Sequence, residues 1–288
     1  MNVIRANVLG FCMGVRRAVE LAAGEARRAA ETGSPVYTLG PLIHNPRVLN
    51  DLKEKGVEAV EALPPECEKC TVIIRAHGIS LEKENDLRDT GCKIVDATCP
   101  RVKASQLKTK ELTRAGYCIF LAGEASHAEI EGVFGYAKDA KFSAIVNSAQ
   151  DAKEAAIRLF QIDGNAKTAL LGQTTISEAL YNDIGSAIKK HFSNLEIINT
   201  ICAAATERQN ALRDLLRKTD AVIIAGGKNS ANTLHLLEIA EESGKPCALA
   251  EDAKDIPPGF FNYKTIGLCA GASTPDSVID EIEAALKG

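Results

Sequence analysis

The stretch Lys93–Ala115, KIVDATCPRVKASQLKTKELTRA, contains the structural unit from which the fold can be argued. Lys93–Thr98 is a short run with several β-branched residues, which predicts a strand. Arg101–Ala115 has the apolar spacing of an amphipathic helix. Cys99 stands between the two, so this unit presents a thiol where a strand ends and a helix begins.

The same alternation of strand and helix runs along all 288 residues and predicts an α/β fold with mostly parallel strands. We expect strands at Asn2–Val8, Val36–Gly40, Thr71–Ala76, Lys93–Thr98, Tyr117–Ala122, Ser143–Asn147, Thr168–Gly172, Leu195–Thr200, Ala221–Ala225, Pro246–Ala250 and Lys264–Leu268. Amphipathic helices are expected between them, among others at Val15–Glu31, Arg101–Ala115, Ser177–Phe192 and Thr206–Lys218.

The arrangement of strand, cysteine and helix occurs three times, at Cys12, Cys99 and Cys202. The cysteines are 87 and 103 residues apart, about the length of one α/β unit each. We therefore expect three similar α/β lobes, each presenting one thiol at the carboxyl end of a strand. The expected boundaries are 15–99, 100–201 and 202–275, with an N-terminal strand and first cysteine in 1–14 and a C-terminal helix in 276–288.

The composition excludes several classes of protein. A formal net charge of -4 gives no excess of basic residues that would favour nucleic acid as a partner. No apolar stretch is long enough for a membrane span, and the N-terminus does not have the pattern of a secretory signal. We expect a cytoplasmic protein, in which the nine cysteines are free thiols or metal ligands.

Thiols at helix N-termini are suited to metal binding because the helix dipole favours the thiolate. Three such cysteines, Cys12, Cys99 and Cys202, can hold a [4Fe-4S] cluster and leave one iron without a protein ligand. The alternatives are that they are small core residues or ligands of a structural zinc ion.

The pair Cys67 and Cys70 allows zinc binding or redox disulfide chemistry as a further interpretation. We do not favour it, because no second pair completes a zinc ribbon and the pair precedes a strand. Cys118 and Cys269 are expected to be buried within strands, and Cys92 and Cys247 to be packing residues.

Polar residues that follow strand ends form a second set, because open α/β sheets bind ligands at the carboxyl ends of their strands. They are His44, His77, His127, Thr174, Ser230, Asn232 and Ser273. Histidine side chains there can donate to phosphate oxygens or relay protons, so His127 is also a catalytic candidate. Serine and asparagine side chains, with turn N–H groups, can bind phosphate oxygens, although several of these residues could simply cap helices. Glu129, two residues after His127, is a candidate proton donor, with a charge at a helix N-terminus as the alternative.

At these residues the sequence resembles the 4-hydroxy-3-methylbut-2-enyl diphosphate reductase family, also called LytB, over essentially the whole chain. The matching segments are Gly10–Ala18, His44–Pro46, Arg75–Gly78, Asp96–Pro100, His127–Glu129, Gln173–Ser177, Thr200–Cys202, Arg208–Gln209, Asn229–Asn232 and Ala270–Ser273. The sequence departs from the common pattern at Ala128, Ala205 and Ala231. These departures put only supporting hydrogen bonds in doubt.

The resemblance implies three α/β lobes with mostly parallel sheets in a pseudo-threefold, trefoil-like arrangement. They surround a central [4Fe-4S] cluster bound by Cys12, Cys99 and Cys202. It implies that His44, His77, His127, Ser230, Asn232 and Ser273 surround a diphosphate, that Glu129 supplies protons and that Thr174 positions the substrate hydroxyl. The implied reaction is the last step of the non-mevalonate pathway of isoprenoid synthesis. It takes two electrons from ferredoxin or flavodoxin and gives isopentenyl and dimethylallyl diphosphate.

Two other hypotheses stay open at this point. A three-cysteine cluster with an open iron could catalyse dehydration without redox chemistry, as a hydro-lyase. The chain could instead be an iron-sulfur or zinc regulatory binding protein, although its acidic charge and lack of a nucleic-acid motif are unfavourable.

Overall fold

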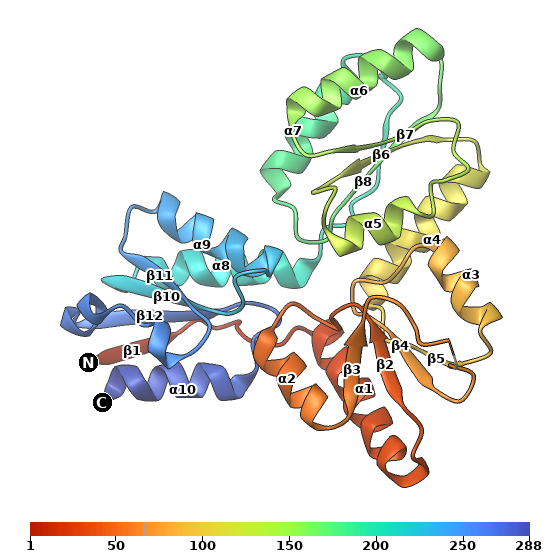
Figure 1. Ribbon diagram of the computed structural model, residues 1–288. Coiled ribbons are helices and arrows are strands. Elements are labelled where there is room, and N and C mark those ends of the chain that lie inside the picture. The colour runs from red at the N-terminus through yellow and green to blue at the C-terminus, as the bar shows by residue number, and fades with distance from the viewer. Residues whose placement is uncertain (66) are drawn as a thin grey trace. The chain divides into compact units, whose positions relative to one another are not determined.

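The computed structural model describes residues 1–65 and 67–288, and its contacts divide the chain into two compact units (Figure 1). The first unit comprises Met1–Thr32, Pro41–Ala59 and Ala203–Gly288, and the second comprises Gly33–Gly40 and Val60–Cys202. Three four-stranded sheets are present in the described chain. The α/β fold expected from the sequence is thereby confirmed.

The sheet of the first unit has the strand order β1-β12-β10-β11, and its paired strands are parallel. Its strands are β1 (Asn2–Arg5), β12 (Thr265–Ala270), β10 (Ala221–Ala225) and β11 (Cys247–Ala250). The unit also contains α1 (Met13–Thr32), α2 (Pro46–Glu54), α8 (Ala203–Leu216), α9 (Ala231–Glu242), α10 (Asp276–Lys287), η1 (Ala253–Asp255) and η2 (Pro258–Asn262).

Strand β10 is buried on both faces, which is typical of a parallel sheet covered by helices on each side. Ile223 packs in a cluster with Ile282 of α10, whereas Ile224 packs with Leu212 of α8 and Leu236 of α9. Figure 1 shows α10 on one face of this sheet and α8 with α9 on the other. The loops that follow β10 and β12 are thus anchored to buried strands.

A second sheet has the order β3-β2-β4-β5, with β2–β4 and β4–β5 parallel. Its strands are β3 (Val57–Val60), β2 (Val36–Leu39), β4 (Thr71–Ile74) and β5 (Lys93–Asp96), and α3 (Leu81–Asp89) lies between β4 and β5 in the chain. Leu87 of α3 packs against Val72 and Ile74 of β4. The division between the two compact units falls within β3.

The third sheet, in the second unit, has the order β7-β6-β8-β9 with parallel pairing. Its strands are β7 (Ser143–Val146), β6 (Cys118–Ala122), β8 (Thr168–Gly172) and β9 (Glu196–Ile197), and its helices are α4 (Pro100–Arg114), α5 (Ala128–Phe134), α6 (Ala149–Ile162) and α7 (Glu178–Lys189). Phe120 packs with residues of α6 and α7, and Ile119 with residues of α4 and α5. The core therefore fixes where β6 and β8 end.

The expected strands all occur, although most are shorter than predicted and Leu195–Thr200 reduces to β9 (Glu196–Ile197). Strand β3 was not expected, because Glu58 and Ala59 are exposed and leave no clear apolar pattern. The five-part domain division and the threefold arrangement around a cluster stay predictions.

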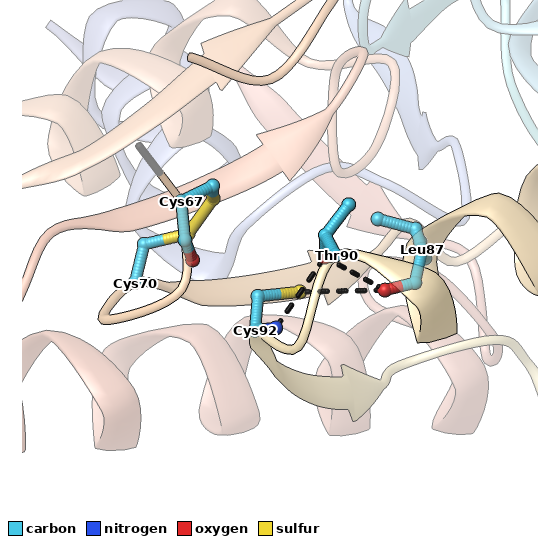
Figure 2. Close-up of a disulfide and its surroundings, with 5 residues drawn as sticks. All are labelled: Cys67, Cys70, Leu87, Thr90 and Cys92. Atoms are coloured by element: carbon cyan, nitrogen blue, oxygen red, sulfur yellow. Dashed lines mark hydrogen bonds between the residues drawn. A yellow bond between two sulfur atoms is a disulfide. The ribbon is translucent and has the colours of Figure 1, made fainter. Parts of the chain in front are cut away.

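The expectation that all nine cysteines carry free thiols or bind metal is wrong for one pair. Cys67 and Cys70 form a disulfide, with both residues buried and their Cα atoms 5.1 Å apart (Figure 2). The Cys70 N–H donates to Cys67 O at 3.1 Å, so a tight turn brings the two side chains together. Cys118 and Cys269 are buried, as expected.

Candidate functional site

Glu129 and Thr174 form a buried pair at the carboxyl ends of β6 and β8. Glu129 lies in the first turn of α5, and Thr174 lies two residues after β8. The Thr174 N–H donates to Glu129 Oε1 and the Thr174 hydroxyl to Oε2, both at 2.7 Å. Each carboxyl oxygen thus has one partner from a residue 45 positions away in the chain.

The environment of Glu129 raises the pKa of its carboxyl towards neutral pH. It is 2 % exposed, and burial raises its pKa to about 7 while the two hydrogen bonds from Thr174 oppose that rise. A carboxyl with a pKa near the working pH can both hold and release a proton. Glu129 therefore has the property required of a general acid.

His127 is the N-cap residue of α5, next to Glu129. Its Nδ1 accepts a hydrogen bond of 3.2 Å from the Glu129 N–H. Since Nδ1 is the acceptor, the proton of the neutral imidazole is on Nε2. His127 can thus present an N–H donor to an anion while it fixes the start of the helix that carries Glu129.

His77 and Cys99 follow the neighbouring strands β4 and β5. The rings of His77 and His127 meet edge to face, with centroids 5.5 Å apart. The Cys99 N–H donates to Ala76 O at 2.9 Å, which places the backbone of Cys99 beside that of His77. Cys99 itself is the N-cap residue of α4.

Cys202 is connected to the Glu129–Thr174 pair through the backbone of Thr174. The Cys202 N–H donates to Thr174 O at 2.9 Å, so Thr174 bonds the carboxyl of Glu129 on one side and the backbone of Cys202 on the other. Sequence reasoning did not single out Thr200, whose hydroxyl is bonded to both the N–H and the carbonyl of Gly172. This threonine binds the segment before Cys202 to the end of β8. The feature of the sequence that could have indicated its role is its position beside Asn199, in a short polar run before Cys202.

In the first unit, Cys12 lies in the loop between β1 and α1. The Cys12 N–H donates to Ala272 O at 3.0 Å, and the Val15 N–H points to Cys12 Sγ at 3.5 Å. Gly10 has φ +77°, and a Cβ there would meet Asp276 and Ile279 at 3.1 Å. The loop therefore requires glycine to hold the thiol at the N-terminus of α1.

The first unit contains four polar residues of the expected anion site, His44, Ser230, Asn232 and Ser273. The Ser273 hydroxyl donates to His44 O at 3.2 Å, and Ser273 directly follows Ala272, the partner of Cys12. Ser230 caps α9 by accepting from the Thr233 N–H at 3.4 Å. Asn232, in the first turn of the same helix, has a buried Nδ2 without a hydrogen-bond partner. A buried donor without an acceptor fits an anionic oxygen as ligand.

The sequence-predicted residues are thus divided between the units. The second unit brings together Glu129, Thr174, His127, His77, Cys99 and Cys202, and the first contains Cys12, His44, Ser230, Asn232 and Ser273. The three cysteines at helix N-termini are half-buried and outside the disulfide. Cysteine side chains so placed suit soft metal centres such as iron-sulfur clusters.

Parallel α/β sheets with a buried carboxyl of raised pKa and with cysteines between strands and helices are features of an α/β enzyme. The chain belongs to the LytB protein family, whose family model matches residues 3–287.

Curated relatives match over nearly their full length. The 4-hydroxy-3-methylbut-2-enyl diphosphate reductase of Treponema denticola is 44 % identical, with 98 % of each chain covered. That of Aquifex aeolicus is 38 % identical and covers 100 % of this chain and 96 % of its own.

Solved structures agree. A structure of (E)-4-hydroxy-3-methyl-but-2-enyl diphosphate reductase, described as the terminal enzyme of the non-mevalonate pathway, has 38 % identity, 99 % coverage of both chains and a TM-score of 0.73. The E-1-hydroxy-2-methyl-but-2-enyl-4-diphosphate reductase of Plasmodium falciparum has 27 % identity, covers 100 % of this chain and 88 % of its own, and gives a TM-score of 0.90. Within the described residues, no helix combines the length and apolar character needed to cross a membrane.

Proposed function

We propose that this protein is a 4-hydroxy-3-methylbut-2-enyl diphosphate reductase, an oxidoreductase that removes the allylic hydroxyl of its substrate. The observation that carries the proposal is the buried Glu129 carboxyl, bonded through both oxygens to Thr174, whose carbonyl in turn holds the backbone of Cys202. A proton donor and a thiol ligand are thereby fixed to the same short loop.

Cys12, Cys99 and Cys202 would hold a [4Fe-4S] cluster. The fit rests on their helix N-termini, their half-buried thiols and the Val15 N–H directed at Cys12 Sγ. When bound, the cluster supplies a Lewis-acidic iron and carries the electrons of the reaction.

The diphosphate would be held by hydrogen-bond donors that carry no fixed charge. In the second unit, His77 and the Nε2–H of His127 are the donors. In the first unit they are His44, Ser230, the Nδ2 of Asn232 and the Ser273 hydroxyl, which would turn from His44 O to the diphosphate. Hydrogen bonds to an anion are strong in a site of low dielectric constant, which makes lysine or arginine unnecessary there.

Glu129 would deliver the proton that converts the substrate hydroxyl into water. Hydroxide is a poor leaving group, so the C–O bond breaks more easily as the oxygen is protonated. Overall, two electrons and two protons enter. One C–O bond is replaced by one C–H bond, with water as the second product. Thr174 would orient the carboxyl of Glu129 and the substrate hydroxyl.

The electrons would come from a small reduced carrier protein of the ferredoxin or flavodoxin type, and we place the enzyme in the cytoplasm. Isopentenyl and dimethylallyl diphosphate are the expected products, because the proton can be added at either end of the allylic system.

Anaerobic iron and sulfide analysis, with an assay of the pure substrate and a reduced donor, tests the proposal. We expect about four irons per chain and two isomeric products. Cys12→Ser, Cys99→Ser and Cys202→Ser should each damage the cluster. Turnover that needs no electron donor would identify a hydro-lyase, and a wild-type protein that binds no iron would refute the proposal.

A further inference from the structure

Arg208 is a buried cation without a carboxylate partner. It lies on α8, is 3 % exposed, and forms no ion pair with any residue in the described part of the chain. A guanidinium removed from water carries a large desolvation penalty that a counter-charge normally offsets. Its position therefore needs an explanation beyond packing.

Two backbone carbonyls hold the guanidinium in place. Nη2 donates to Gly10 O at 2.7 Å and Nη1 to Ala204 O at 2.9 Å, while Nε is buried without a partner. Carbonyl dipoles orient the group but leave its unit charge uncompensated. All three residues belong to the first unit.

Neither of two neighbouring acidic groups supplies the missing charge. The thiol of Cys269 lies near Arg208, but burial raises the pKa of this thiol to about 12, so it stays neutral. Asp276 lies beside Gly10 but is exposed to water and makes no ion pair with Arg208. Among the described residues, no ionised group thus forms an ion pair that balances the charge of Arg208.

The contact with Gly10 places Arg208 close to Cys12. Gly10 and Cys12 are two residues apart, a separation of at most ~7 Å between Cα atoms. A negative centre bound by Cys12 would therefore lie on the order of 10 Å from the guanidinium. We propose that Arg208 is a positioning residue that holds the Cys12 loop and supplies the positive charge that balances a thiolate-bound metal cluster.

This inference rests on the proposed function and adds a determinant of reduction potential to it. Three thiolates make a bound [4Fe-4S] cluster negative overall, and reduction adds one more negative charge. A nearby buried cation stabilises the reduced form more than the oxidised form. Unit charges ~10 Å apart at an effective dielectric constant of ~20 change an equilibrium by about tenfold.

The test is a potentiometric titration of the reconstituted cluster, followed by electron paramagnetic resonance, in wild type, Arg208→Gln, Arg208→Lys and Arg213→Gln. Arg213 is an exposed arginine on the same helix, so Arg213→Gln deletes an equal charge that is already screened by water. We expect the ratio of reduced to oxidised cluster at fixed potential to fall about tenfold in Arg208→Gln, which is ~59 mV for one electron. Arg208→Lys should lie nearer to wild type, and Arg213→Gln should be unchanged.

Equal shifts in Arg208→Gln and Arg208→Lys, or no shift in either, would overturn the inference. If Arg208→Gln binds no cluster, cluster loading is compared between Arg208→Gln and Arg208→Lys. Each variant must first show the circular dichroism spectrum of the folded wild type. If Arg208→Lys binds the cluster and Arg208→Gln does not, a positive charge at this position is required, as proposed. If neither folded variant binds the cluster, the inference is overturned. A wild type that loads no cluster refutes the proposed function instead.

Discussion

Replacing Glu129 with glutamine should separate stability from activity, because the buried carboxyl is unfavourable for folding once it ionises. Its pKa rises from 4.5 to about 7 on burial. A shift of this size corresponds to on the order of 3 kcal/mol between the protonated and ionised forms. Glutamine keeps the shape and the acceptor for the Thr174 N–H but cannot ionise.

The sign of the pH dependence follows from the raised pKa. The folded protein binds this proton more tightly than the unfolded chain does, so the contribution to stability is fully present below pH ~4.5. It is lost as the pH rises to about 7, where the folded carboxyl also ionises. Wild type should therefore lose up to ~3 kcal/mol across this window, whereas Glu129→Gln should not.

Glu129→Gln should be less active than wild type, although it should be more stable at neutral pH. Loss of a general acid lowers turnover by roughly 10²–10⁴-fold. In wild type, turnover should decline as the pH rises through about 7, because the protonated Glu129 is the active form. The measurements are urea denaturation of both proteins from pH 5 to 8 and single-turnover rates with reduced donor.

The matched control is Glu131→Gln, on the same helix. Glu131 is exposed, bonded to Lys83 at 2.8 Å and 3.6 Å from Arg75, so its removal should change stability by no more than about 1 kcal/mol and leave the activity near wild type. The reasoning fails if Glu129→Gln keeps more than about a tenth of wild-type turnover. It also fails if the variant's stability declines with pH as steeply as that of wild type.

Three further predictions, with four variants, test other contacts. Thr174→Val removes a hydrogen bond that lowers the pKa of Glu129, so the decline of turnover should move to higher pH, and an unmoved profile would contradict this. Asn232→Ala should raise KM roughly 10- to 100-fold with little change in kcat, because a hydrogen bond to a charged group contributes about 1.5–3 kcal/mol. An unchanged KM in steady-state kinetics would contradict the assignment of Asn232 to the diphosphate. Cys67→Ser and Cys70→Ser should lower the free energy of unfolding by about 2 kcal/mol through loss of the crosslink, while iron analysis should show an intact cluster.

Much of the fold is determined locally. Thr168–Gly172 and Ala221–Ala225 are continuous apolar runs, and both strands have the bounds predicted from the sequence. Strand β3 was not predicted because its middle residues, Glu58 and Ala59, are exposed and give no alternation of apolar and polar side chains. Its pairing with β2 defines it as a strand.

The disulfide shows a different limit. Chain composition and the expected compartment favoured thiols at Cys67 and Cys70, whereas the turn between them decides whether two sulfur atoms meet. A spacing of three residues permits either outcome, because the backbone conformation sets the distance.

The sequence by itself determined the α/β class, the cysteines placed between strands and helices, and the types of polar residue at the strand ends. Only the tertiary structure decided that Glu129 shares both oxygens with Thr174, and that Arg208 is buried against the carbonyl of Gly10. Strand and helix patterns are set by neighbours along the chain. Burial and hydrogen-bond partners depend on segments 45 and 198 residues apart, which meet only when the sheets pack.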